Sequence, residues 1–183
     1  MFVRIAILSA VCALASCKPP PTDEDILRAL PEGSPVFASD PLPSPDIEGA
    51  VWAPSATKGR ILYGKAGEPP LVALACLEGT SVLRLTRMSP ADEGAQALAA
   101  IIGNGHIGRI EVDATKVNDQ IVWQGDLDAN SLKWEPLAGP RQLTLTVPGA
   151  GLVKLNASGM PGNVIDNCRN GSTAGSLAAG ALD

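Results

Sequence analysis

The chain has 183 residues and a net charge of −5, with 14 Lys and Arg against 19 Asp and Glu. Nucleic acids and anionic lipid surfaces need clustered basic residues, so this balance argues against both as partners. The length is enough for one domain with a sizeable core. Aromatic residues make up only 3%, whereas Gly and Pro number 19 and 16, which is typical of a turn-rich fold with short strands.

The first 16 residues have the anatomy of a secretory signal, with a basic start at Arg4 and an apolar centre over 5–13. That centre is too short to span a bilayer as a helix, which needs about 20 residues. The run Leu14-Ala-Ser-Cys17 then matches the lipobox of bacterial lipoproteins, in which the cysteine is acylated and becomes the first mature residue. The alternative is an ordinary signal peptide that happens to contain Cys17. We expect residues 1–16 to be removed and Cys17 to carry the lipid.

Lys18 follows the expected acylated cysteine. In Gram-negative sorting an Asp at that place commonly retains a lipoprotein at the inner membrane, so Lys18 predicts the periplasmic face of the outer membrane. Several acyl chains together give stable anchorage. The expected partners are therefore the membrane, through the lipid, and an envelope protein or peptidoglycan.

Two cysteines remain in the mature chain, Cys76 and Cys168. An even pair in an exported protein favours a disulfide, worth ~4.5 kcal/mol for a loop of this length. The alternative, two ligands of a metal site, lacks any Cys or His neighbour at ligand spacing.

Proline spacing divides the chain into segments. Residues 17–46 are expected to be the lipidated cysteine and an extended Pro-rich tether, which at ~3.1 Å per residue would reach about 90 Å if stiff. Residues 47–169 are expected to form a β domain, and the small, polar residues 170–183 a disordered tail.

Alternating apolar residues predict most of the elements of the β domain. Ser89-Pro90, followed by acidic residues, instead predicts a helix start, with the helix running to about Ile102. We expect strands over 60–63, 71–77, 81–87, 110–114, 121–124, 142–147 and 152–155, and a last turn of helix over 161–169. The fold class is therefore mainly β, an antiparallel β-sandwich or partly open barrel of about seven or eight short strands with one α-helix.

Three short motifs suggest chemistry but lack its context. Gly103-Asn-Gly-His-Ile-Gly108 has the G-x-G-x-x-G spacing, but a dinucleotide site needs it to open a helix, whereas here it follows one. Ser55-Ala-Thr-Lys58 fits S-x-x-K without a helix or the companion motifs. Asp126-Leu-Asp-Ala-Asn130 begins like a calcium loop, but Leu137 stands where the bidentate Glu belongs. We interpret all three as turns and expect no nucleotide, cofactor or metal.

His106 is the only histidine, so it alone could supply a Ser-His or Cys-His pair, and we expect it to be structural or exposed. The tryptophans Trp52, Trp123 and Trp134 could line a sugar or peptide surface, but core positions are favoured. No catalytic set is assembled.

Residues Trp52-Ala-Pro, Leu62-Tyr-Gly64, Pro70-Leu-x-x-Leu-x-Cys76 and Val164-Ile-x-x-Cys168-Arg169 together resemble a group of uncharacterised small lipoproteins of alphaproteobacteria. The resemblance covers about 51–169, supports the disulfide and a single domain, and implies no activity. The leading hypothesis is a non-enzymatic envelope lipoprotein that binds another envelope component. The alternatives are an inhibitor of a lysozyme-like or other envelope-targeting hydrolase, and an enzyme of unrecognised type.

Overall fold

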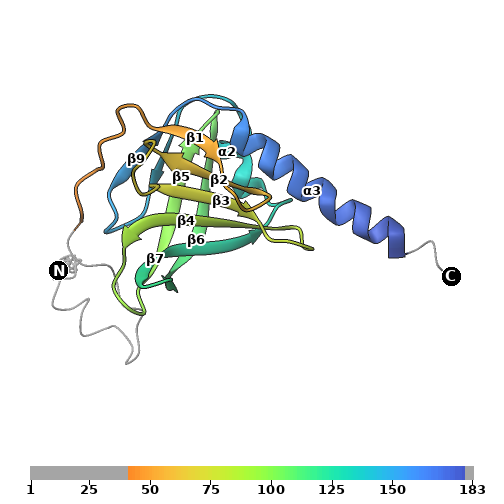
Figure 1. Ribbon diagram of the computed structural model, residues 1–183, viewed down its shortest axis with the longest axis horizontal. Helices are drawn as coiled ribbons and strands as arrows, with labels where there is room; N and C mark the ends of the chain where they lie inside the picture. The colour runs from red at the N-terminus through yellow and green to blue at the C-terminus, as the bar shows by residue number, and fades with distance from the viewer. Residues whose placement is uncertain (1–40, 180–183) are drawn as a thin grey trace, which may run out of the picture. The chain divides into compact units, whose positions relative to one another are not determined.

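The computed structural model describes residues 41–179, with side chains to residue 171 (Figure 1). Within this range nine strands form one antiparallel sheet that curls into a nearly closed, barrel-like fold. The strands are β1 Val51–Pro54, β2 Arg60–Gly64, β3 Val72–Cys76, β4 Val82–Pro90, β5 Gln96–Gly103, β6 His106–Val117, β7 Gln120–Asp128, β8 Leu143–Thr146 and β9 Leu152–Leu155. The expected mainly β class is confirmed, and of its two forms the barrel is the right one. The expected signal, lipidated Cys17 and Lys18 lie outside the described residues.

The strand order is β1-β2-β3-β4-β7-β6-β5-β8-β9, so two meanders meet where β4 pairs with β7. Inward side chains alternate with outward ones along each strand, as in any barrel wall. On β4, for example, Leu83 and Leu85 are buried inside the barrel. On the outer side of the same strand, Arg84 forms a bidentate pair with Asp126 of β7, at 2.7 and 2.5 Å.

The expected helix over 89–102 is wrong, because this stretch forms the end of β4, the connection over 91–95 and all but the last residue of β5. Only Ala99 and Ile101 of β5 are fully buried, whereas Leu98 and Ile102 point outward. Alanine favours helices in isolation, but β5 has hydrogen-bonded neighbours on both edges, β6 and β8. These ladders outweigh the intrinsic helix propensity of the segment.

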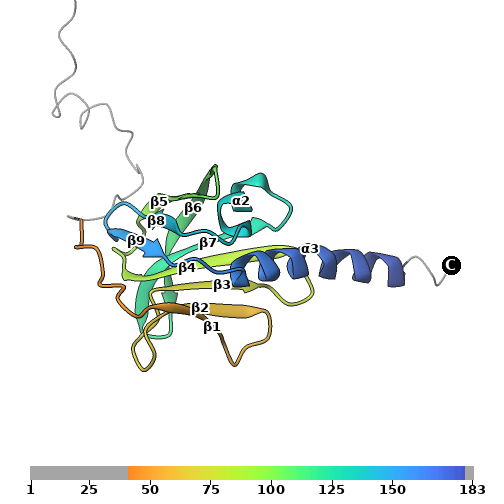
Figure 2. The same ribbon diagram turned by 90° about the horizontal axis from the view of Figure 1, so that it is seen from above.

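The seam between β1 and β9 is bridged by side chains (Figure 2 shows the two strands at the start and end of the sheet). The buried hydroxyl of Tyr63 donates to the Lys154 carbonyl at 3.1 Å and accepts from the Asn156 amide at 3.2 Å. The Asn156 side chain donates to the Ala50 carbonyl at 2.7 Å. The Trp52 ring packs on the Tyr63 ring with centroids 5.3 Å apart. Side-chain bonds thus bring the sheet ends together.

Three helical elements follow β7: η1 Leu132–Trp134, α2 Glu135–Ala138 and α3 Met160–Ala179. Pro161, Ile165 and Cys168 form the buried face of α3, at helical spacing. Gly162 lies so close to α2 that a Cβ there would collide with the Ala138 carbonyl. These contacts fasten the start of α3, and its far end projects away from the strands in both ribbon views (Figures 1 and 2).

The expected disulfide is present. The sulfur atoms of Cys76 and Cys168 are 2.04 Å apart, with Cα atoms 5.5 Å apart, and join the end of β3 to α3. The helix expected over 161–169 is therefore confirmed as the element that presents Cys168. It continues to Ala179, so most of the segment expected as a disordered tail is helical.

The last residues of the expected tether belong to the barrel. The Leu42 amide donates to the Gly149 carbonyl at 2.8 Å, and the Ser44 hydroxyl accepts from the Leu152 amide. Asp46 pairs with Lys65 at 2.6 Å. These bonds place residues 42–46 along the β8–β9 turn and β2, so the part of the tether that could extend ends before residue 42. Among the described residues no helix is long and apolar enough to span a membrane.

Candidate functional site: the outer face of the β5–β6 hairpin

Three large apolar side chains gather on the outside of the β5–β6 hairpin. Leu98, Ile102 and Ile107 are 49%, 51% and 59% exposed. Ile102 and Ile107 are direct cross-strand partners, and Leu98 lies on the same side of β5 because it is four residues before Ile102. We call these three residues the hairpin face.

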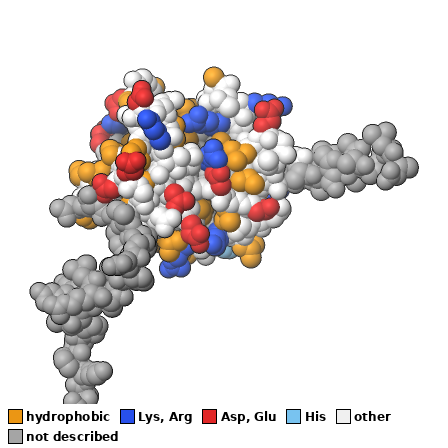
Figure 3. Space-filling view, turned by 90° about the horizontal axis from the view of Figure 1, so that it is seen from below, with side chains coloured by type: hydrophobic (Ala, Val, Ile, Leu, Met, Phe, Trp, Pro, Cys, Tyr) orange, Lys and Arg blue, Asp and Glu red, His pale blue; other side chains and the backbone are white. Residues whose placement is uncertain are grey.

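Polar and charged residues surround the hairpin face. Arg109 and Glu111 lie on the same side of β6, opposite Ala100 and Leu98 respectively. On the other edge, Thr144 and Thr146 of β8 stand opposite Ile102 and Ala100. An exposed apolar centre with a polar rim is the usual anatomy of a protein-binding surface. Elsewhere charges are mixed, and the side of the molecule drawn in Figure 3 carries acidic and basic side chains interspersed with hydrophobic ones.

The hairpin turn holds this face in place. Asn104 and Gly105 have φ of +51° and +84°, the left-handed pair that a two-residue turn of this kind requires. The Asn104 side chain donates to the Pro136 carbonyl at 2.8 Å and accepts from the Arg141 amide at 3.1 Å. The tip is therefore fastened to α2 and the loop after it. His106, next to the turn, is exposed.

The G-x-G-x-x-G motif coincides with this turn. Gly103 ends β5 and Gly108 lies in β6, so the motif runs strand–turn–strand. The expectation that it is a turn is confirmed, although a strand and not a helix precedes it. A pyrophosphate site needs the amides of a helix N-terminus, and no helix begins at these glycines.

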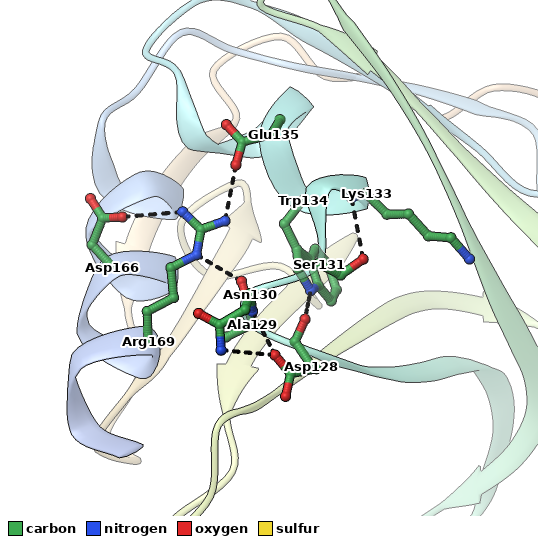
Figure 4. Close-up of polar contacts among 9 residues, drawn as sticks. All are labelled: Asp128, Ala129, Asn130, Ser131, Lys133, Trp134, Glu135, Asp166 and Arg169. Carbon is green, nitrogen blue, oxygen red and sulfur yellow. Dashed lines mark hydrogen bonds and ion pairs between the residues drawn. The ribbon is translucent and has the colours of Figure 1, made fainter. Parts of the chain in front are cut away.

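The calcium-like motif does not converge on one point. Asp126 points out of the barrel toward Arg84. Asp128 instead accepts from the amide and side chain of Asn130, at 2.7 and 3.0 Å, and its pKa is lowered by these bonds and by the Ser81 hydroxyl (Figure 4). Within the described part of the chain, no group of three or more His, Cys, Asp or Glu side chains could hold a metal ion.

The loop after Asp128 anchors α3, as Figure 4 shows. Arg169 donates from Nε to the Ala129 carbonyl at 2.7 Å and pairs with Glu135 at 3.0 Å and Asp166 at 3.6 Å. The indole of Trp134 donates to the Asp128 carbonyl at 3.0 Å. These contacts explain the Cys168-Arg169 pair structurally: one residue bonds α3 covalently to β3, and the other binds it to the β7–α2 loop.

The remaining motif residues are also structural. The Ser55 hydroxyl accepts from the Thr57 amide in the β1–β2 turn, and no helix places Lys58 above it. Trp52, Trp123 and Trp134 are buried, so the expectation that they are core residues is confirmed.

The hairpin face itself is absent from the sequence-based expectations. The helix expected over 89–102 places Leu98, Ile101 and Ile102 together on a buried face, whereas in a strand Ile101 points inward and its neighbour Ile102 outward. The signal that could have found it was the apolar run on both sides of an Asn-Gly dipeptide, which indicates a hairpin.

A comparison of the chain with protein-family models, curated proteins and solved structures found no match.

Proposed function

We propose that this protein is a lipid-anchored, non-enzymatic binding module of the bacterial cell envelope, tethered to the outer membrane through Cys17. The lipobox supports the anchor, and Lys18 supports the outer membrane as its destination. The Cys76–Cys168 disulfide fits an oxidising compartment outside the cytoplasm.

The observation that carries the binding role is the hairpin face. Stable monomers seldom leave several large apolar side chains together in water without a partner. The hairpin face is rigidly presented, because its turn is fastened through Asn104. Its charged rim at Arg109 and Glu111 suits a protein partner, which can match both the apolar centre and the charges. We infer that the partner is an envelope protein.

The inhibitor alternative has less support. Protein inhibitors of lysozyme-like hydrolases would present polar residues such as Ser and Tyr on a protruding loop. Tyr63, the only tyrosine, is buried, and its hydroxyl both donates and accepts a hydrogen bond across the seam.

The anchor is tested by fractionating cells that produce either the natural chain or Cys17→Ala. We expect the natural chain in the outer membrane with an acylated N-terminal cysteine by mass spectrometry, and the variant outside that fraction. A natural chain that is soluble and unmodified, or a variant that still reaches the outer membrane, would contradict the anchor.

The binding role is tested with the double variant Ile102→Ser/Ile107→Ser. We expect it to fold and to be anchored normally but to lose the defect-rescuing activity of the natural chain in cells that lack the gene. Val51→Ser is the matched control, since Val51 is equally exposed at 55% but lies on β1. Full rescue by the hairpin variant would exclude this face as the binding surface.

A further inference from the structure

Arg87 is a cation buried inside the barrel. Its side chain is on the inner side of β4, and the residue is only 5% exposed. Nη1 donates to the Leu71 carbonyl at 3.0 Å and Nη2 to the Ala150 carbonyl at 3.1 Å, but Nε is buried without a hydrogen-bond partner. Among the described residues no carboxylate forms an ion pair with it.

Burial lowers the pKa of Arg87 to about 10, and no neighbouring charge opposes that effect. The guanidinium therefore remains protonated at neutral pH. A buried charge is costly unless it is paired, and carbonyl groups supply only partial negative charge. The interior thus holds one uncompensated positive charge.

Trp123, the cross-strand partner of Arg87, carries a second unsatisfied donor. It stands directly opposite Arg87, on β7, and is 1% exposed. Cross-strand partners have Cβ atoms about 4.5–5.5 Å apart, so the two side chains are neighbours. The Trp123 indole nitrogen is buried and has no partner. The indole of Trp134, in contrast, donates to a carbonyl, as a buried tryptophan usually does.

The backbone has an irregularity directly after Arg87. The β4–β7 register shifts between Arg87 and Pro90, a bulge in the strand. On the other edge of β4, the Met88 amide and the Arg87 guanidinium both donate to the Leu71 carbonyl. Bulges often occur where a strand must direct a particular side chain.

A bound anion would satisfy both unpaired donors and compensate the buried charge. An acceptor is needed for the unpaired N–H groups of two cross-strand partners, and a negative charge is needed for the guanidinium. The inward neighbours are small, with Ala114 as the other cross-strand partner of Trp123 and Ala95 fully buried. Because Arg87 and Trp123 are only 5% and 1% exposed, a ligand between them must be compact enough to be enclosed by the barrel.

We propose that Arg87 and Trp123 form an internal binding site for a small monoanion, either a halide or the carboxylate of a short organic acid, accepting from Arg87 Nε and Trp123 Nε1. The anion would stabilise the barrel where β3, β4 and β7 meet. This site is separate from the hairpin face.

The test follows thermal unfolding of the full-length protein in a non-ionic detergent. Sodium gluconate, whose anion is too large for the site, is replaced stepwise by chloride, bromide or formate at constant ionic strength. Because an anion that binds only the folded state raises Tm, we expect a saturable increase of roughly 5 °C. The halide and formate arms distinguish the two sources of the monoanion.

Arg87→Met should abolish the anion dependence. Replacing a buried ion by an apolar residue of similar volume is often tolerated, so we expect the variant to fold. Trp123→Phe keeps a ring and removes the N–H, and should weaken the anion dependence several-fold. Arg84→Met is the matched control, because Arg84 lies on the same strand but pairs with Asp126 outside the barrel, and its dependence should match the natural chain.

The proposal would be overturned by a Tm for the natural chain that is the same in every anion, which would mean that water satisfies these donors. An anion dependence that persists in Arg87→Met would also overturn it. So would an apparent anion affinity that Trp123→Phe leaves unchanged. The last result decides the question if Arg87→Met does not fold. Bromide soaked into crystals should give an anomalous peak within hydrogen-bond distance of Arg87 Nε.

Discussion

At the seam between β1 and β9, buried polar atoms are paired and two aromatic rings pack against each other at a tilt, whereas the hairpin face leaves three large apolar side chains in water. The seam, together with the disulfide that fastens α3, uses its side chains to close the fold. The hairpin is held by backbone ladders on both sides of β5, so we expect its outer side chains to contribute little to stability. If the proposed function is right, stability and recognition depend on different strands, and substitutions in the two regions should have different consequences.

Loss of the disulfide should have the largest effect. The bond closes a loop with a sequence separation of 92, for which the chain-entropy model gives ~4.5 kcal/mol. We expect Cys76→Ser/Cys168→Ser to lower the free energy of unfolding by up to that amount in urea titrations. Reductant should destabilise the natural chain but not the variant. Two titratable thiols in protein isolated without reductant would contradict the bond.

Tyr63→Phe should have the next largest effect, because it removes a buried hydroxyl that serves two backbone groups. The Lys154 carbonyl and the Asn156 amide would each lose their partner, at a cost of about 1–3 kcal/mol. The measurement is again urea unfolding, with Thr57→Ala, an exposed hydroxyl, as the control. If the two variants were equally stable, the seam would not depend on the tyrosine.

The same hydroxyl predicts a dependence on pH. Burial raises the pKa of Tyr63 above its ordinary value of 10.0, so the folded protein keeps a proton that the unfolded chain releases. The contribution of Tyr63 to stability should therefore fall as the pH rises from 10 through the folded pKa, so the advantage of the natural chain over Tyr63→Phe should shrink. Absorbance of the phenolate reports this pKa directly, since the chain has one tyrosine. An advantage that is constant to pH 11 would contradict the assignment.

Ile102→Ser should have the smallest effect on stability, within about 0.5 kcal/mol, because the side chain is half exposed and makes no closure contact. Binding in the cell should nevertheless be lost. A destabilisation as large as that of Tyr63→Phe would show that the hairpin face is part of the structural framework, and the contrast between the two regions would fail.

The sequence predicts the strands whose patterns alternate and the disulfide that export favours. It does not predict β5, because a segment such as Leu98-Ala-Ala-Ile101 suits a helix. The segment becomes a strand only through pairing with β6, which follows a turn, and with β8, which is distant in the sequence. The hairpin face was missed for the same reason. Arg87 was expected to end an alternating strand, and the alternation places it on the same side as Leu83 and Leu85. Whether its charge is buried there depends on how β3, β4 and β7 close around it, which no local pattern gives.

The most direct test of the central claim places a photo-crosslinking residue at position 102 in living cells, with the same residue at position 51 as the control. We predict one crosslinked adduct with an envelope protein from position 102 and no adduct with that protein from position 51. We also predict that the adduct from position 102 is lost in Ile107→Ser and in Cys17→Ala. The same adduct from both positions, or no adduct at position 102 in cells that need the protein, would contradict the assignment of binding to the hairpin face.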